Sequence, residues 1–75
     1  MKKSVLELKS IISAGGSIVI NAQDYMPLEL KYLASSTRIT GGKIYIKNAH
    51  KLTTLACKNI VLSGTQGSVI FDFAE

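Results

Sequence analysis

Tryptophan is absent from this 75-residue sequence, and cysteine, histidine and proline each occur once. The single cysteine, Cys57, excludes an internal disulfide bond, lacks the partners of a zinc cluster and favours a reducing, cytoplasmic location. No serine or cysteine is tied to the only histidine, His50, by spacing, and the five acidic residues form no pair that indicates acid–base catalysis or a metal site. We therefore expect a protein that is not an enzyme and has no catalytic residue, cofactor or metal.

Long apolar runs are also missing, and the charge is only mildly unbalanced. No uninterrupted apolar stretch approaches the length of a membrane span, and Glu7 and Lys9 interrupt the segment that would follow residues 1–3 in a signal peptide. Nine Lys and Arg against five Asp and Glu give a net charge of +4, which permits contact with nucleic acid or an acidic partner without requiring it. We expect no membrane association.

An internal repeat organises the chain. Residues 4–22, 26–49 and 53–74 can be aligned almost position for position, and each unit ends in a glycine followed by a short alternating apolar run. The shared positions include Leu6, Leu28 and Leu55, and also Lys9, Lys31 and Lys58. A period in the twenties predicts stacked units that bury a common core, so residues 1–75 are expected to form a single domain.

The first part of each unit has the signals of a helix. Ser4 and Glu7 form a capping box, Pro27 suits a first helical position, and Thr53 is a natural cap for the third helix. Gly15 and Gly64 stand where left-handed helix stops are expected. The second unit lacks this glycine, which predicts that its helix frays through residues 35–37.

The second part of each unit has the alternation of a strand. One set of side chains is apolar throughout, namely Ile18, Ile20, Ile44, Ile46, Val69 and Phe71. The other set is mixed, namely Ser17, Val19, Asn21, Lys43, Tyr45, Lys47, Ser68, Ile70 and Asp72. The predicted sheet is therefore covered by helices on one side only.

The predicted fold class is α/β. Three tandem helix–strand repeats would form a short solenoid-like, two-layer domain, with a parallel three-stranded sheet and all helices on one face. The alternative is a small β-helix, because Gly-x-Ile-x-Ile runs recur and Asn21 and Asn48 would suit stacked turns. The capping signals and Pro27 favour a helix in each unit.

One group of residues could bind a small ligand, whereas the glycine pairs are not expected to do so. The pairs 15–16 and 41–42 follow a helix and precede a strand, the reverse of the order in a phosphate-binding loop, and are interpreted as helix stops and tight turns. Polar residues gather instead beyond the carboxyl ends of the strands, where parallel sheets bind ligands. These residues are Asn21, Asp24, Asn48, His50, Lys51 and Asp72. For the two asparagines, hydrogen bonding to the loop backbone is the favoured interpretation.

The mixed face of the sheet is the main candidate for an interaction surface. Lys43, Tyr45 and Lys47 project from this face beside Val19 and Ile70. An exposed apolar stripe requires a cover, which indicates a protein partner or a second copy of the chain. A tyrosine flanked by cations could instead stack on bases and hold phosphates, so nucleic acid is the alternative partner.

The last strand is a second candidate. If the units stack in order, residues 69–73 form an apolar edge strand that ends at Phe73 and could pair with a strand of another molecule. The sequence thus predicts a non-enzymatic protein-interaction module, self-associating through the open sheet face or this edge strand. The alternative is a nucleic-acid-binding protein that uses the basic and aromatic sheet surface.

Overall fold

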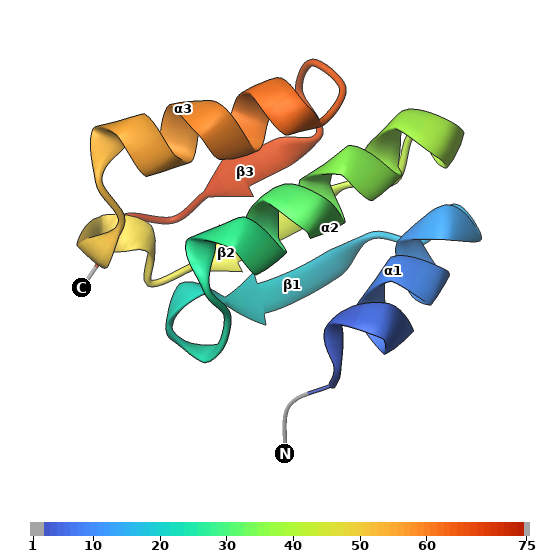
Figure 1. Cartoon of the computed structure of the whole chain (residues 1–75), viewed down its shortest axis with the longest axis horizontal. Helices are drawn as coiled ribbons and strands as arrows, with labels where there is room; N and C mark the ends of the chain where they lie inside the picture. The colour runs from blue at the N-terminus through green and yellow to red at the C-terminus, as the bar shows by residue number, and fades with distance from the viewer. Residues whose placement is uncertain (1–2, 75) are drawn as a thin grey trace.

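Helices and strands alternate along the chain in the computed structural model, which describes residues 3–74 (Figure 1). Two single-turn 3₁₀ helices, η1 and η2, follow the first two strands. The elements are α1 (Val5–Ser13), β1 (Ile18–Asn21), η1 (Ala22–Asp24), α2 (Pro27–Thr40), β2 (Ile44–Lys47), η2 (Ala49–Lys51), α3 (Thr54–Ser63) and β3 (Val69–Phe71).

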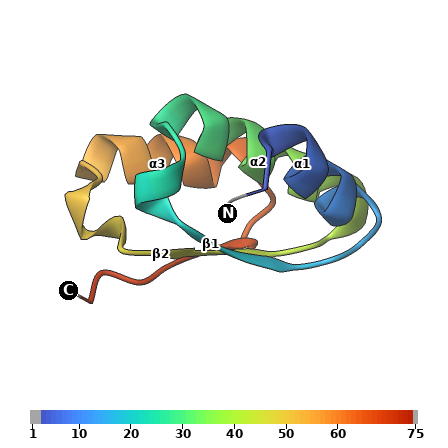
Figure 2. The ribbon, with the colours of Figure 1, turned by 90° about the horizontal axis from the view of Figure 1, so that it is seen from below.

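The three strands form one open parallel sheet in the order β1-β2-β3. All three helices lie on the same side of it, and the other side is bare (Figure 2). Each crossover between neighbouring strands contains a helix, which is the connection that parallel strands require. The predicted α/β fold with a three-stranded parallel sheet is confirmed, and the β-helix alternative is wrong because helices of 9, 14 and 10 residues occupy the first part of each unit.

The helix starts follow the capping signals. The Ser4 hydroxyl accepts a hydrogen bond from the Glu7 N–H at 3.2 Å, and the Glu7 carboxylate accepts one from the Ser4 N–H at 3.0 Å. In α2 the Glu29 carboxylate accepts from the Met26 N–H at 2.7 Å, and in α3 the Thr53 hydroxyl accepts from the Ala56 N–H. These bonds satisfy N–H groups that have no partner within a helix.

The helix ends differ from the predictions at two places. The second helix does not fray at residues 35–37 but continues to Thr40, where Gly41 ends it with a left-handed φ of 79°. Gly15 is left-handed as predicted, with a φ of 97°, whereas Gly64 has an extended backbone. Gly64 is needed for space instead, because a Cβ there would lie 2.9 Å from the carbonyl oxygen of Ala34.

The core lies between the helices and the covered face of the sheet. Its completely buried members come from every helix and from the central strand, and they include Ile12, Leu33, Ile44, Ile46 and Ile60. The outer strands β1 and β3 contribute the same alternate positions with somewhat greater exposure. The apolar set of strand residues therefore faces the helices, and the mixed set is left on the bare side with one exception. Ser68 was assigned to the mixed face, but it is buried and its hydroxyl is hydrogen-bonded to Thr37 of α2.

Hydrogen bonds tie α2 to both neighbouring helices. The Thr40 hydroxyl donates to the carbonyl of Ile12 at the end of α1, at 2.6 Å. The Arg38 guanidinium donates to the carbonyls of Ser63 and Leu62 at the end of α3, at 2.8 and 3.0 Å. All three bonds reach carbonyls that have no partner within their own helix.

Candidate interaction surfaces

The bare side of the sheet carries an apolar row. Val19 of β1, Tyr45 of β2 and Ile70 of β3 are direct neighbours in the two parallel registers. They are 65%, 37% and 42% exposed, respectively. Because the row crosses all three strands without interruption, it is a continuous apolar surface at the centre of the open face.

Lysines flank this row on the central strand. Lys43 and Lys47 stand two residues before and after Tyr45, so the strand alternation puts all three side chains on the open face. All three are exposed. Ser17, Val19, Lys43, Tyr45 and Ile70 also line a shallow hollow of about 220 Å³. The structure thus brings together five of the six residues predicted for the interaction surface.

The sixth residue, Phe73, lies apart from the row. Its ring stacks on that of Phe71, with 5.7 Å between the ring centroids and 24° between the ring planes. Phe71 belongs to the apolar strand set and packs against the core. Phe73 therefore extends the C-terminal side of the sheet, beyond β3, and is not part of the row formed by Val19, Tyr45 and Ile70.

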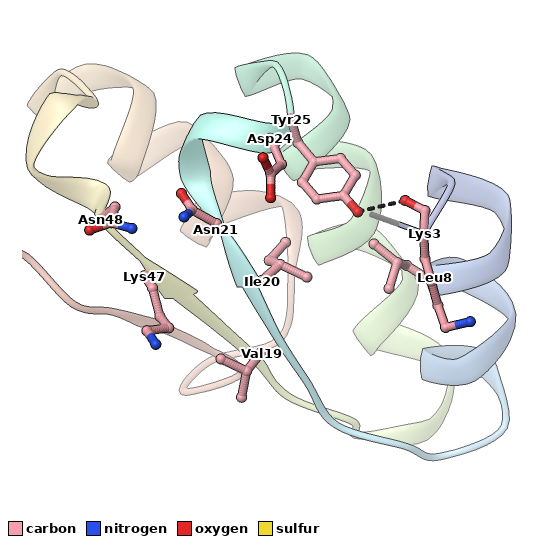
Figure 3. Close-up of a pocket in the computed structure, with 9 residues that line it drawn as sticks. All are labelled: Lys3, Leu8, Val19, Ile20, Asn21, Asp24, Tyr25, Lys47 and Asn48. Carbon is pink, nitrogen blue, oxygen red and sulfur yellow. Dashed lines mark hydrogen bonds between the residues drawn. The ribbon is translucent and has the colours of Figure 1, made fainter. Parts of the chain in front are cut away.

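A further hollow lies where β1 ends, between that strand and α1 (Figure 3). It has a volume of about 440 Å³, and Leu8 and Ile20 line it beside the ring of Tyr25. The Tyr25 hydroxyl donates a 2.6 Å hydrogen bond to the backbone carbonyl of Lys3, which closes one side. Burial raises the pKa of this hydroxyl, and the neighbouring carboxylate of Asp24 raises it further.

Only part of the predicted ligand group reaches this hollow. Asn21, Asp24 and Asn48 line it, together with Lys47 from the interaction set, whereas His50, Lys51 and Asp72 do not (Figure 3).

The two asparagines and Asp72 have backbone roles. The Asn21 side chain accepts from the Gln23 N–H at 2.8 Å, which confirms the structural interpretation of this residue. Asn48 takes a left-handed φ of 56°, a conformation that asparagine tolerates. The Asp72 carboxylate accepts from the Ala74 N–H, and the Asp72 carbonyl accepts from the Ala49 N–H, both at 2.9 Å. Asp72 therefore joins the end of β3 to the loop after β2, Asn21 bonds within its own loop, and Asn48 contributes only its backbone conformation.

His50 and Cys57 are less exposed than reactive groups usually are. His50 is half-buried, and its Nδ1 is buried with no hydrogen-bond partner in the described residues. Cys57 is half-buried on α3, and burial raises the pKa of its thiol, which therefore stays protonated at neutral pH. Within residues 3–74 no three His, Cys, Asp or Glu side chains gather in a way that could hold a metal ion.

A second apolar row was not identified from the sequence as a surface. Leu6, Leu28 and Leu55 occupy one repeat position and are largely exposed near the starts of the three helices. Between α2 and α3, Leu28 and Leu55 line a shallow hollow of about 260 Å³. The signal available in the sequence was a leucine that recurs at one repeat position of each unit, outside the apolar positions that form the core face of the helix.

No protein-family model matches the chain, and the comparisons with curated proteins and with solved structures likewise give no match. None of the helices described between residues 3 and 74 has the length and apolar character needed to cross a membrane.

Proposed function

We propose that this protein is a non-enzymatic interaction module that associates with a second copy of itself through the open face of the sheet. The single observation that carries the proposal is the uninterrupted row of Val19, Tyr45 and Ile70. Exposed apolar surface rimmed by polar side chains is typical of protein interaction sites, and here Lys43 and Lys47 form the rim. When the open sheet faces of two copies pack together, each covers the apolar side chains that the other leaves exposed.

The proposed architecture is a short solenoid of three helix–strand units, spanning residues 4–22, 26–49 and 53–74 in one domain. Two features support it. The hydrogen-bonded helix starts fall at one repeat position in all three units. The strand registers place equivalent residues of neighbouring units side by side, as with Ile18, Ile44 and Val69. Units of this kind bury their core only against one another.

Sedimentation equilibrium of a Tyr45→Asp variant tests the open-face contact. A charge at the centre of the row should weaken self-association by at least about 30-fold, the size of an interface hot spot. Tyr32→Asp is a matched control, because Tyr32 lies on α2 with 41% exposure, close to the 37% of Tyr45. Equal association constants for wild type and Tyr45→Asp, with both folded, would show the proposed contact to be wrong.

A second candidate function is single-stranded nucleic-acid binding. It is favoured by one observation, the exposed Tyr45 between two exposed lysines on one strand face. Aromatic rings on a sheet stack on bases, and the lysines would hold phosphates. Retention of single-stranded RNA should then fall with salt and be lost in a Lys43→Glu, Lys47→Glu double variant. The charge-matched control is Lys31→Glu, Lys58→Glu on the helices, and no retention of the wild type at low salt eliminates this function.

A further inference from the structure

Both edges of the sheet are free in the described structure. Each outer strand pairs with β2 alone among the described strands. One row of backbone N–H and C=O groups on β1 and one on β3 is thus left without a sheet partner. Such rows are templates for pairing with a further strand.

The exposure of equivalent residues shows which side of each helix packs against the preceding helix. Ile11 of α1, Leu33 of α2 and Ile60 of α3 occupy one repeat position. Leu33 and Ile60 are completely buried, whereas Ile11 is 38% exposed. Only α1 has no helix before it in the described chain. This position therefore faces the preceding helix, and on α1 it is uncovered.

The next position along each helix shows the opposite pattern. Ile12 of α1 and Ala34 of α2 are completely buried, whereas Val61 of α3 is 38% exposed. Among the described helices only α3 has none after it. This position therefore faces the following helix, and on α3 it is uncovered. The two ends of the stack carry the two halves of a contact that the chain itself makes twice, between α1 and α2 and between α2 and α3.

We propose that copies of this chain join head to tail, with α3 and the free edge of β3 of one copy against α1 and the free edge of β1 of the next. The contact repeats the packing between neighbouring units inside the chain. It uses the two ends of the stack and is independent of the open-face contact proposed above.

The hollow between α1 and β1 is placed to receive side chains from β3 of the neighbouring copy. Within the chain Ile20 pairs with Ile46, and Ile46 pairs with Phe71. The same register continued across copies places Phe71 of one copy beside Ile20 of the next, which lines the 440 Å³ hollow with Leu8 (Figure 3). Phe73, stacked on Phe71, follows it toward the Tyr25 side of this hollow. The partly exposed rings of Phe71 and Phe73 would therefore lie at the hollow lined by Leu8 and Ile20 of the next copy.

The exposed flank of α3 carries an apolar hollow with a lysine at its side. This shallow hollow of about 290 Å³ is lined by Thr54, Cys57, Lys58, Val61 and Leu62. Inside the chain the equivalent of Lys58 on α1 is Lys9, whose ammonium lies 5.0 Å from the centroid of the Tyr32 ring on α2. Head-to-tail docking should carry Lys58 across to α1 of the next copy in the same way.

A contact of this kind does not end at two copies. Its two halves are different surfaces, so each added copy presents a new free end until the assembly closes into a ring. The wild-type chain should accordingly form a concentration-dependent series of oligomers.

The test blocks one end at a time. All variants carry Tyr45→Asp, which removes the proposed open-face contact. In that background Val61→Asp removes the α3 half and Ile11→Asp removes the α1 half, and each variant alone should sediment as a monomer, with association at least about 30-fold weaker than that of Tyr45→Asp alone. An equimolar mixture restores one intact contact and should form a heterodimer and nothing larger. Leu28→Asp, an exposed α2 position away from both ends, is the matched control and should assemble like Tyr45→Asp alone.

The outcomes separate this contact from the open-face one. If both end variants assemble as Tyr45→Asp alone does, or if their mixture stays monomeric, head-to-tail docking is wrong, whether or not Tyr45→Asp itself weakens association relative to the wild type. A wild-type chain that remains monomeric up to about 1 mM overturns it as well. Should Ile11→Asp fail to fold by circular dichroism, Ala14→Arg on the same exposed flank of α1 replaces it. The mixture is then made with that variant, and normal assembly of both variants or a monomeric mixture would again show head-to-tail docking to be wrong.

Discussion

The hydroxyl oxygens of Thr37 and Ser68 lie 3.1 Å apart in the interior of the protein. Both residues are buried, although they come from the middle of α2 and from the turn before β3. The Thr37 oxygen also accepts a hydrogen bond from the Thr65 N–H at 3.2 Å. This small polar cluster fixes the path of the chain from α3 into β3.

Replacing Thr37 with valine should destabilise the protein by about 1–3 kcal/mol, because the Thr65 N–H and the Ser68 hydroxyl lose a buried partner while the side-chain volume is kept. Urea unfolding measures the loss. Thr37→Ser keeps the hydroxyl and measures the cost of losing the buried methyl group alone. A Thr37→Val variant as stable as the wild type would contradict the role given to the cluster.

Gly64→Ala should be destabilising although the backbone at Gly64 is extended. The added Cβ would lie 2.8 Å from the Ser68 hydroxyl oxygen and 2.9 Å from the Ala34 carbonyl oxygen, closer than carbon and oxygen normally approach. We expect a loss of about 1–3 kcal/mol from the resulting shifts, measured by thermal or urea unfolding. Unchanged stability would mean that α3 can move away from α2 without cost.

Phe71→Asp should unfold the domain. Phe71 packs against the core from the last strand, and an aspartate there removes apolar burial worth about 1.5–3 kcal/mol and places a charge at the edge of the core. A domain of this size has only about 5–10 kcal/mol of stability to lose. Phe73→Asp, two residues on and 55% exposed, is the matched control and should stay folded by circular dichroism.

Tyr25 should make the protein sensitive to alkaline pH. Burial raises the pKa of its hydroxyl above the ordinary value of 10.0. Above pH 10 the unfolded chain loses this proton while the folded chain retains it, so stability falls as the pH rises through that range. Tyr25→Phe should remove this fall, at a cost of about 1 kcal/mol at neutral pH for the lost bond to the Lys3 carbonyl. Parallel pH profiles for wild type and variant, measured by urea unfolding, would contradict the assignment.

Local signals predicted most of the elements. Ser4 with Glu7, Pro27, and Thr53 marked the three helix starts because capping is a short-range interaction between residues three apart. A helix between each pair of strands predicted parallel pairing, because parallel strands need such a crossover. Strand alternation predicted the bare side of the sheet, since each side chain's face depends on its position along the strand.

Long-range packing explains where the prediction failed. Gly64 was interpreted as a left-handed helix stop. A glycine is required there because the backbone of Ala34, thirty residues earlier, lies too close to leave room for a side chain, and no local sequence pattern indicates such a contact. Ser68 was assigned to the mixed face by its place in the strand alternation, but it is buried and hydrogen-bonded to Thr37, thirty-one residues earlier.

By itself the sequence determined the order of the elements, the parallel sheet and the row of Val19, Tyr45 and Ile70, because caps and alternation act over a few residues. Only the tertiary structure decided how equivalent positions differ. Ile11 and Val61 belong to sets that are otherwise completely buried, and they are exposed because they lie at the two ends of the stack. Burial depends on which element lies next to a residue, and that neighbour is set by the fold of the whole chain.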